Sequence, residues 1–450
     1  MGPSSRAGTR VTRTPRLPGR TWRPAVILGV VLLGVAIGVL SLLQGSARGF
    51  AIAAGAFSVG VALALSLPFE FLLLLPLVGA SWLPLPTVLG RTVDDWLVVF
   101  FLVIAGVRLM GRVRSLDRAA KLAILACGLL ACASLVAAVA HVWSDGFAAL
   151  RFFSYALVVL GCLTLSPTAH RRLVIGLHLV VAGVAVSVLL ESMGALPLLV
   201  QYADREAPGS RAGGLIGHPN FAAGILAIGI LQLVVATSPR GWRRYALLGL
   251  YGSAILLTGS RGAFLALGLA LLLCLPRFKA RLIPMAAVLG IAYLIFGSLV
   301  AARLQFLAES GGVTGANAAG WRIDHWNTVL SLAASPQWIG VGWNRIQYLI
   351  PDGLGAHNGY LEVYVELGVL GCFALALLIA ALASRALKAR TPLVPLAVLI
   401  LLLTISDPGL MYPPLCYAVL LLFFSDEGRP GIARRPRSAD AHNLRIPALA

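Results

Sequence analysis

The chain has 450 residues, of which 59% are hydrophobic and only 12% are charged, well below the quarter or so of charged residues usual in soluble domains. This composition excludes a soluble enzyme and predicts an integral membrane protein. The net charge of +19 would suit a nucleic-acid-binding protein, but the Lys and Arg residues form short clusters between apolar runs, as membrane insertion requires, so we predict no nucleic-acid partner.

The N-terminal segment 1–24 is rich in Arg and is followed by the apolar run 25–44, which is long enough to cross a bilayer. No small-residue cleavage site follows this run, so we expect a cytoplasmic tail and a first span rather than a removed signal peptide. Similar apolar runs recur along the chain and predict an all-α polytopic membrane protein with about 12–14 transmembrane helices. The predicted helices are 25–44, 50–67, 70–88, 95–110, 120–140, 147–165, 172–193, 219–236, 243–258, 262–276, 281–301, 358–384, 391–405 and 410–425.

The distribution of positive charge predicts which segments face the cytoplasm. With the N-terminus inside, 27 of the 36 Lys and Arg residues fall on the inner side and nine, all Arg, on the outer side. The long segments 194–218 and 302–357 are then external. The expected organisation is a cytoplasmic tail at 1–24, transmembrane helices over 25–301, a large and partly helical external loop at 302–357, further transmembrane helices over 358–425, and a cytoplasmic tail at 426–450.

Four external stretches carry the polar groups that could perform chemistry. They read SRAGGLIGHPN (210–220), TGSRGAFLAL (258–267), WRIDHWNTVL (321–330) with PQWIGVGWN (336–344), and AHNGYLEVYVELGVLG (356–371). Although they are far apart in the sequence, the charge distribution places them on one side of the membrane. We therefore expect a single site that faces the outside.

Three external arginines are candidates for binding an anion. Arg211 and Arg261 each lie beside glycine and a hydroxyl residue at the mouth of a span, where a guanidinium and helix N–H groups could hold phosphate oxygens. The alternative is that each Arg reaches the membrane interface as a long amphipathic side chain. Arg322 shares a predicted helix face with Trp326 and could bind a glycan or phosphate, or pack over the membrane.

His357 is the strongest candidate for a general base. It precedes Asn358, which can cap the next helix and leave the imidazole in an external aqueous pocket. A neutral imidazole can accept a proton from a hydroxyl group near pH 7. A histidine that is simply satisfied at the interface is the alternative, and His218 and His325 are reserve candidates on the same side.

Two carboxylates follow on the same predicted helix. Glu362 and Glu366 are four residues apart and share a face, and Glu366 should meet a pocket, a partner Arg or the bundle interior because a charge inside a span is costly. It could orient His357 or pair with an outer Arg. The six cysteines form no C-x-x-C pair and no Asp-rich motif lies on the outer face, so we predict no metal and no cofactor.

The stretches RAGGLIGHPN, GSRGAFLAL and HNGYLEVYVELGVLG, with WR…W and P…GVG between the last two, resemble the O-antigen ligase and polysaccharide polymerase family of bacterial membrane glycosyltransferases over about 205–375. The resemblance implies metal-independent transfer of a glycan from a polyprenyl pyrophosphate carrier to a glycan or a lipid-anchored acceptor. The reaction would take place on the outer face of the cytoplasmic membrane, among membrane lipids.

The resemblance also implies roles for individual residues. The family's catalytic histidine falls on His357, with Asn358 and Leu361 in the other fixed places of its motif, while its pyrophosphate-binding arginines resemble Arg211 and Arg261 and its loop-helix arginine resembles Arg322. Asn358 and Glu366 complete the expected substrate-binding set. Ligase and polymerase differ in the acceptor, and the sequence leaves both open.

The alternative from a different functional class is a transporter or flippase for a lipid-linked sugar. Transporters tend to carry ionisable groups near the membrane midplane, within paired repeats. Here the polar candidates gather at the outer mouth of the spans and no repeat between the halves is seen, which favours the enzyme.

Overall fold

The computed structural model describes eleven stretches of the chain, and every statement below concerns them. They are 68–82, 93–110, 116–141, 146–195, 211–235, 241–309, 318–333, 338–351, 353–388, 393–407 and 409–425. The chain divides into two compact units, Met1–Ser66 and Leu67–Ala450, and all described residues belong to the second. The predicted spans 25–44 and 50–67 and both predicted tails therefore lie outside the described residues.

Every regular element in the described residues is a helix, which confirms the all-α prediction. In chain order they are α3 (Phe69–Leu72), α4 (Leu75–Trp82), α5 (Val93–Leu109), α6 (Arg118–His141), α7 (Gly146–Thr164), α8 (Pro167–Ser192), η2 (Gly214–Ile216), α9 (Pro219–Val235), α10 (Trp242–Thr258), α11 (Arg261–Glu309), α12 (Ala318–Leu332), α13 (Ile346–Leu349), α14 (Gly359–Lys388), α15 (Leu393–Ser406), η3 (Gly409–Met411) and α16 (Pro413–Phe424).

Five described segments are long and apolar enough to cross a membrane, namely α6, α8, α14, Phe147–Thr164 of α7 and Phe278–Ile295 of α11. Five shorter apolar helical segments accompany them: Phe69–Ser81, α9, Arg261–Pro276, α15 and α16. The chain is thus a multi-pass, all-α membrane protein.

Most predicted helices agree with the observed ones to within a few residues, and the exceptions have physical reasons. α8 begins at Pro167 rather than near residue 172, because Ser166 caps it by accepting from the Ala169 N–H at 3.3 Å, so its polar first turns are helical. The predicted helices 262–276 and 281–301 are two parts of α11, which is interrupted at Phe278. α11 continues to Glu309, beyond the end of the helix predicted at 281–301.

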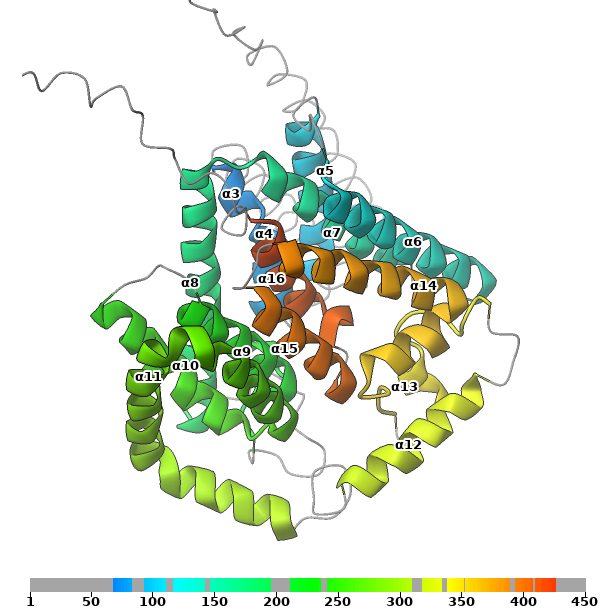
Figure 1. Ribbon diagram of the computed structural model, residues 1–450. Helices are drawn as coiled ribbons and strands as arrows, with labels where there is room; N and C mark the ends of the chain where they lie inside the picture. Colours follow the sequence, from blue (N-terminus) through cyan, green and yellow to red (C-terminus); the bar gives the residue numbers. More distant parts are fainter. Residues whose placement is uncertain are drawn as a thin grey trace, which may run out of the picture. The chain divides into compact units, whose positions relative to one another are not determined.

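Helix α9 lies at the centre of the described bundle. It contacts α8, α10, α11, α15 and α16, and almost all of its residues are buried. A helix that is apolar on every side is expected to be enclosed in this way. On another side of the bundle α6 and α14 lie next to each other along much of their length (Figure 1).

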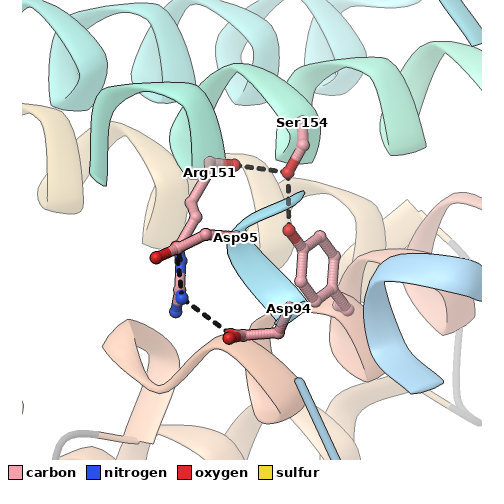
Figure 2. A network of polar contacts seen from close by, with 5 residues as sticks. Asp94, Asp95, Arg151 and Ser154 are labelled. Atoms are coloured by element: carbon pink, nitrogen blue, oxygen red, sulfur yellow. Dashed lines mark hydrogen bonds and ion pairs between the residues drawn. The ribbon is translucent and has the colours of Figure 1, made fainter. Parts of the chain in front are cut away.

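A group of polar contacts joins α5, α7 and α16. The Arg151 guanidinium donates to Asp94 at 2.6 Å and to Asp95 at 2.7 Å, so that it bridges two consecutive carboxylates (Figure 2). One turn further along α7, the Ser154 hydroxyl shares a 2.6 Å hydrogen bond with the Tyr417 hydroxyl of α16. These contacts fix the position of α16. The segment that precedes α16 contributes to the site described below.

The loop between α11 and α14 docks, through residues 341 and 342, on a break in α14. Gly368 has φ +65° and ψ −161°, a conformation that interrupts the helix and releases carbonyl groups of the preceding turn. Val341 N–H donates to the Val365 carbonyl at 2.9 Å and Gly342 N–H to the Glu366 carbonyl at 3.0 Å. The GVG stretch of the loop therefore supplies the hydrogen bonds that the broken helix lacks.

The loop has a small apolar core of its own. Val329 of α12, Ile346 of α13 and Ala356 pack together with Val365 of α14, all of them buried. The predicted helix within the loop is α12. Its packing places α12 over the segment that leads into α14.

Candidate active site

His357 lies immediately before the residue that caps the start of α14. Asn358 Oδ1 accepts from the N–H groups of Tyr360 at 3.0 Å and Leu361 at 3.1 Å, which confirms the predicted cap. His357 itself has φ +50°, in the left-handed region. For a residue with a side chain this conformation costs about 1–2 kcal/mol and persists only where the surroundings hold it.

Asp407, in the loop between α15 and η3, is the carboxylate partner of His357. Its Oδ1 lies 3.5 Å from His357 Nδ1, and the two side chains are only 8% and 16% exposed. The Asp407 carbonyl also accepts from the Gly359 N–H at 3.1 Å, so the loop is tied to the start of α14. The stretch SDPGLMYPP (406–414) separates the predicted spans 391–405 and 410–425. An Asp at such a break is the sequence signal that could have identified Asp407.

The same carboxylate is linked to Arg211 through Asn220. Asn220 Nδ2 donates to Asp407 Oδ1 at 3.2 Å, and Asn220 Oδ1 accepts a short hydrogen bond from Arg211. The Arg211 Nε–H donates to the Thr258 carbonyl at 3.0 Å. A continuous polar chain thus runs from Arg211 through Asn220 and Asp407 to His357.

The backbone that carries Arg211 and His218 is fixed by α8. Glu191 accepts from the N–H groups of Gly213 at 2.9 Å and Gly214 at 2.5 Å. At Gly213 a Cβ would lie only 2.7 Å from the backbone of residues 217 and 218, so the tight turn requires glycine. The stretch RAGGLIGHPN is therefore a rigid support that delivers one Arg, one His and one Asn to the site.

His218 lies beside His357, with their ring centroids 6.4 Å apart. Its Nδ1 atom and the Nε2 atom of His357 are both buried and have no hydrogen-bond partner among the described residues. Burial lowers the pKa of His218 to about 4, Asp407 opposes this shift, and the positive charge of Arg211 acts in the same direction as burial. His218 is therefore neutral near pH 7.

Helix α12 covers the segment before His357. His325 Nε2 lies 2.8 Å from the Gly355 carbonyl, and Trp326 Nε1–H donates to the Ala356 carbonyl at 2.9 Å. The Trp321 ring stacks on His325 at 4.6 Å and meets the edge of His357 at 5.9 Å between centroids. His325 is thus close to His357, but its Nε2 is used by a backbone carbonyl.

The other predicted residues lie at differing positions. Arg261 is exposed at the first turn of α11, just after Thr258, the residue that binds Arg211. Arg322 is half-buried on α12 beside Trp321. Glu366 is buried, and its Oε1 accepts from the Ile346 N–H at 3.2 Å, so this carboxylate holds the loop.

The family comparison favours the enzyme over the transporter. Residues 245–376, less than a third of the chain, match the family model described as O-antigen ligase. This match supports the O-antigen ligase family. No curated protein matches the chain.

The O-antigen ligase match covers most of α10 together with α11, α12, α13 and the first part of α14, so it includes Arg261, Arg322 and His357. Arg211, Asn220 and Asp407 lie outside the matched residues and reach the site through the fold. Similarity to the O-antigen ligase family supports a membrane enzyme of the glycosyltransferase type, with a lipid-linked glycan donor and an acceptor at a general level.

Proposed function

We propose that the protein transfers a glycan from a polyprenyl pyrophosphate carrier to an acceptor hydroxyl at the outer face of the cytoplasmic membrane, with His357 as the general base. The observation that carries the proposal is the pairing of His357 Nδ1 with Asp407 while Nε2 has no partner among the described residues. A base that is oriented by a third group through its other nitrogen is the arrangement that activates a hydroxyl nucleophile.

The chemistry follows from this orientation. With a proton on Nδ1 facing Asp407, the lone pair of His357 Nε2 accepts the proton of the acceptor hydroxyl. The acceptor oxygen forms a bond to the anomeric carbon, the bond from that carbon to the pyrophosphate oxygen breaks, and the electron pair leaves with polyprenyl pyrophosphate. General-base help of this kind contributes about 10²–10⁴-fold in rate, and a single displacement inverts the anomeric carbon.

The unpaired nitrogens have an energetic consequence for substrate binding. A buried polar atom without a hydrogen bond costs about 1–3 kcal/mol. His357 Nε2 and His218 Nδ1 have no partner among the described residues and lie within one site. Both can hydrogen-bond a glycan hydroxyl, which supports a sugar as the occupant of the site.

The arginines supply charge for the departing pyrophosphate without a requirement for metal. Arg261 is exposed at a helix start, where guanidinium and backbone N–H groups can act together on phosphate oxygens. Arg322 lies on α12, the helix that covers the segment before His357, and in this proposal it also binds the donor. Arg211 holds Asn220 and adds positive charge beside the leaving group.

Two predicted substrate-binding residues support the site without binding substrate. Asn358 caps α14 and Glu366 anchors the external loop, so we propose that both support the site indirectly.

The acceptor can be a lipid-anchored core glycan, as for a ligase, or a second carrier-linked glycan, as for a polymerase. The lipid-linked intermediates that accumulate in a deletion strain distinguish the two.

The decisive experiment uses purified protein with a polyprenyl pyrophosphate glycan and an acceptor. His357→Ala should fold and bind the donor but lose most transfer, and His357→Gln should do no better because an amide cannot accept the proton. Glycan transfer and donor binding are measured for both variants in one detergent preparation. Near-normal transfer by either variant would remove His357 from the mechanism and make His218 the next candidate.

A further inference from the structure

Two consecutive backbone carbonyls before His357 are held by consecutive residues of α12. The His325 imidazole contacts the Gly355 carbonyl at 2.8 Å, and the Trp326 indole N–H donates to the Ala356 carbonyl at 2.9 Å. On the other side of His357, the Gly359 N–H donates to the Asp407 carbonyl at 3.1 Å. The backbone of His357 is therefore tied on both sides, to α12 and to Asp407.

This arrangement explains why His357 adopts a conformation that residues with side chains rarely take. Its φ of +50° needs support from the surrounding structure. Ala356 is fully buried against Val329 of α12, so packing and hydrogen bonding act in the same direction. If the two carbonyls were released, the backbone could relax and turn the imidazole away from Asp407.

The hydrogen bond also limits what His325 can do. A carbonyl oxygen only accepts, so the proton shared with Gly355 belongs to His325 Nε2. That nitrogen is then unable to take a proton from a substrate. His325 acts on the site through the backbone.

We propose that His325 and Trp326 are positioning residues, through which the external helix α12 fixes the left-handed conformation of His357 and so aims its imidazole at Asp407. The inference rests on the proposed role of His357 as the base. It makes the docking of α12 a condition for an aligned active site.

The test removes one donor at a time while keeping the packing. Trp326→Phe loses the indole N–H but retains a ring, and Trp343→Phe is its matched control, because Trp343 lies in the same loop and makes an edge contact with Phe152 at 5.2 Å between centroids. We expect kcat to fall roughly tenfold in Trp326→Phe, since small displacements of a reacting group cost rate, with the donor KM unchanged within about twofold. Trp343→Phe should keep the wild-type kcat.

A second pair of variants tests the other carbonyl. His325→Gln retains a donor and should keep most of the wild-type kcat, whereas His325→Leu should lose it. Amide hydrogen exchange should become faster over 353–361 in Trp326→Phe and His325→Leu, and stay unchanged in the two other variants. Together, kcat and amide exchange report on the alignment of the His357 imidazole and not only on the stability of the protein.

The proposal is overturned if Trp326→Phe and His325→Leu keep the wild-type kcat. It is also overturned if their exchange rises equally over the rest of α14 and α15, because that pattern shows general destabilisation. His357→Ala, measured in parallel, separates this result from a failure of the proposed function. Full activity of His357→Ala would refute the base, while the local exchange change in Trp326→Phe would still establish the contact of α12 with the backbone before His357.

Discussion

Asn220 and Asp407 are separated by 187 positions in the chain, and the Asn220 amide donates to the Asp407 carboxylate at 3.2 Å. Because the amide oxygen of Asn220 accepts from Arg211, its nitrogen must point to Asp407. The carboxylate oxygen that receives this bond is also the one that faces His357. One amide thus sets the position of the charge that orients the proposed base.

Asp407→Asn should abolish most transfer while leaving the fold in place. An amide at this position keeps the size of the side chain but cannot stabilise the imidazolium or fix its tautomer, and we expect a loss on the order of 10²-fold or more in kcat. Donor binding should be retained. Asp324→Asn, an exposed acid on α12, is the matched control. An Asp407→Asn enzyme as active as that control would show that His357 works without this carboxylate.

Arg211→Lys and Arg261→Lys should each impair transfer although the charge is kept. Lys has no Nε–H for the Thr258 carbonyl and no planar fork for phosphate oxygens. Steady-state transfer and donor affinity are measured at matched protein levels, with Arg243→Lys as the control, since Arg243 contacts the Trp242 ring on the predicted cytoplasmic side. Full activity of both Lys variants would favour the alternative, in which Arg211 and Arg261 only reach the membrane interface.

The buried environment of His218 predicts a pH dependence of stability. Its pKa is about 4 in the folded protein against an ordinary value of 6.5, so between these values the unfolded chain binds a proton that the folded chain does not. Stability should therefore fall as the pH falls from about 6.5 to 4, by at most about 1.4 kcal/mol per pH unit and by less because His218 is partly exposed. Thermal unfolding of wild type and His218→Asn should diverge in this window. If the melting temperatures of the two proteins changed in parallel with pH, the lowered pKa of His218 would be contradicted.

Gly340→Ala should undock the loop between α11 and α14. Gly340 has φ +75°, and a Cβ there would overlap the Glu366 carbonyl that accepts from Gly342. We expect faster amide exchange over 341–350 and reduced transfer. Gly320→Ala is the control, because a Cβ at Gly320 meets nothing within 4 Å and alanine is favoured over glycine in a helix by about 1 kcal/mol. Equal behaviour of the two variants would rule out a docking role for the GVG turn.

Reporter fusions test the predicted sidedness of the site. Fusions at residues 115, 242 and 387 should report the cytoplasm, and fusions at 207 and 330 should report the outside. Opposite reports from 207 and 330 would separate the two external stretches and refute a single outward-facing site.

Much of this fold follows from local sequence features. Apolar length predicts the helices, and the position of Asn358 before a helical pattern predicts the cap. The partners of His357 could not be predicted in this way, because Asp407 and Asn220 approach it through the packing of α9, α15 and α14. Glu366 illustrates the same limit. Its position nine residues after His357 suggested a role beside that residue. The break at Gly368 instead leaves backbone groups to which the loop binds, and the Glu366 side chain binds the same loop.

The break at Gly368 divides α14 into two parts with different attachments. The outer part, which starts just after His357, is bonded to the loop residues Val341, Gly342 and Ile346, whereas the remainder packs beside α6. The loop and the outer turns of α14 therefore form one exchangeable module whose natural boundary lies within the helix. A chimera between relatives that differ in acceptor should be joined at Gly368, since a junction at the loop end would separate the proposed base from the segment that holds it.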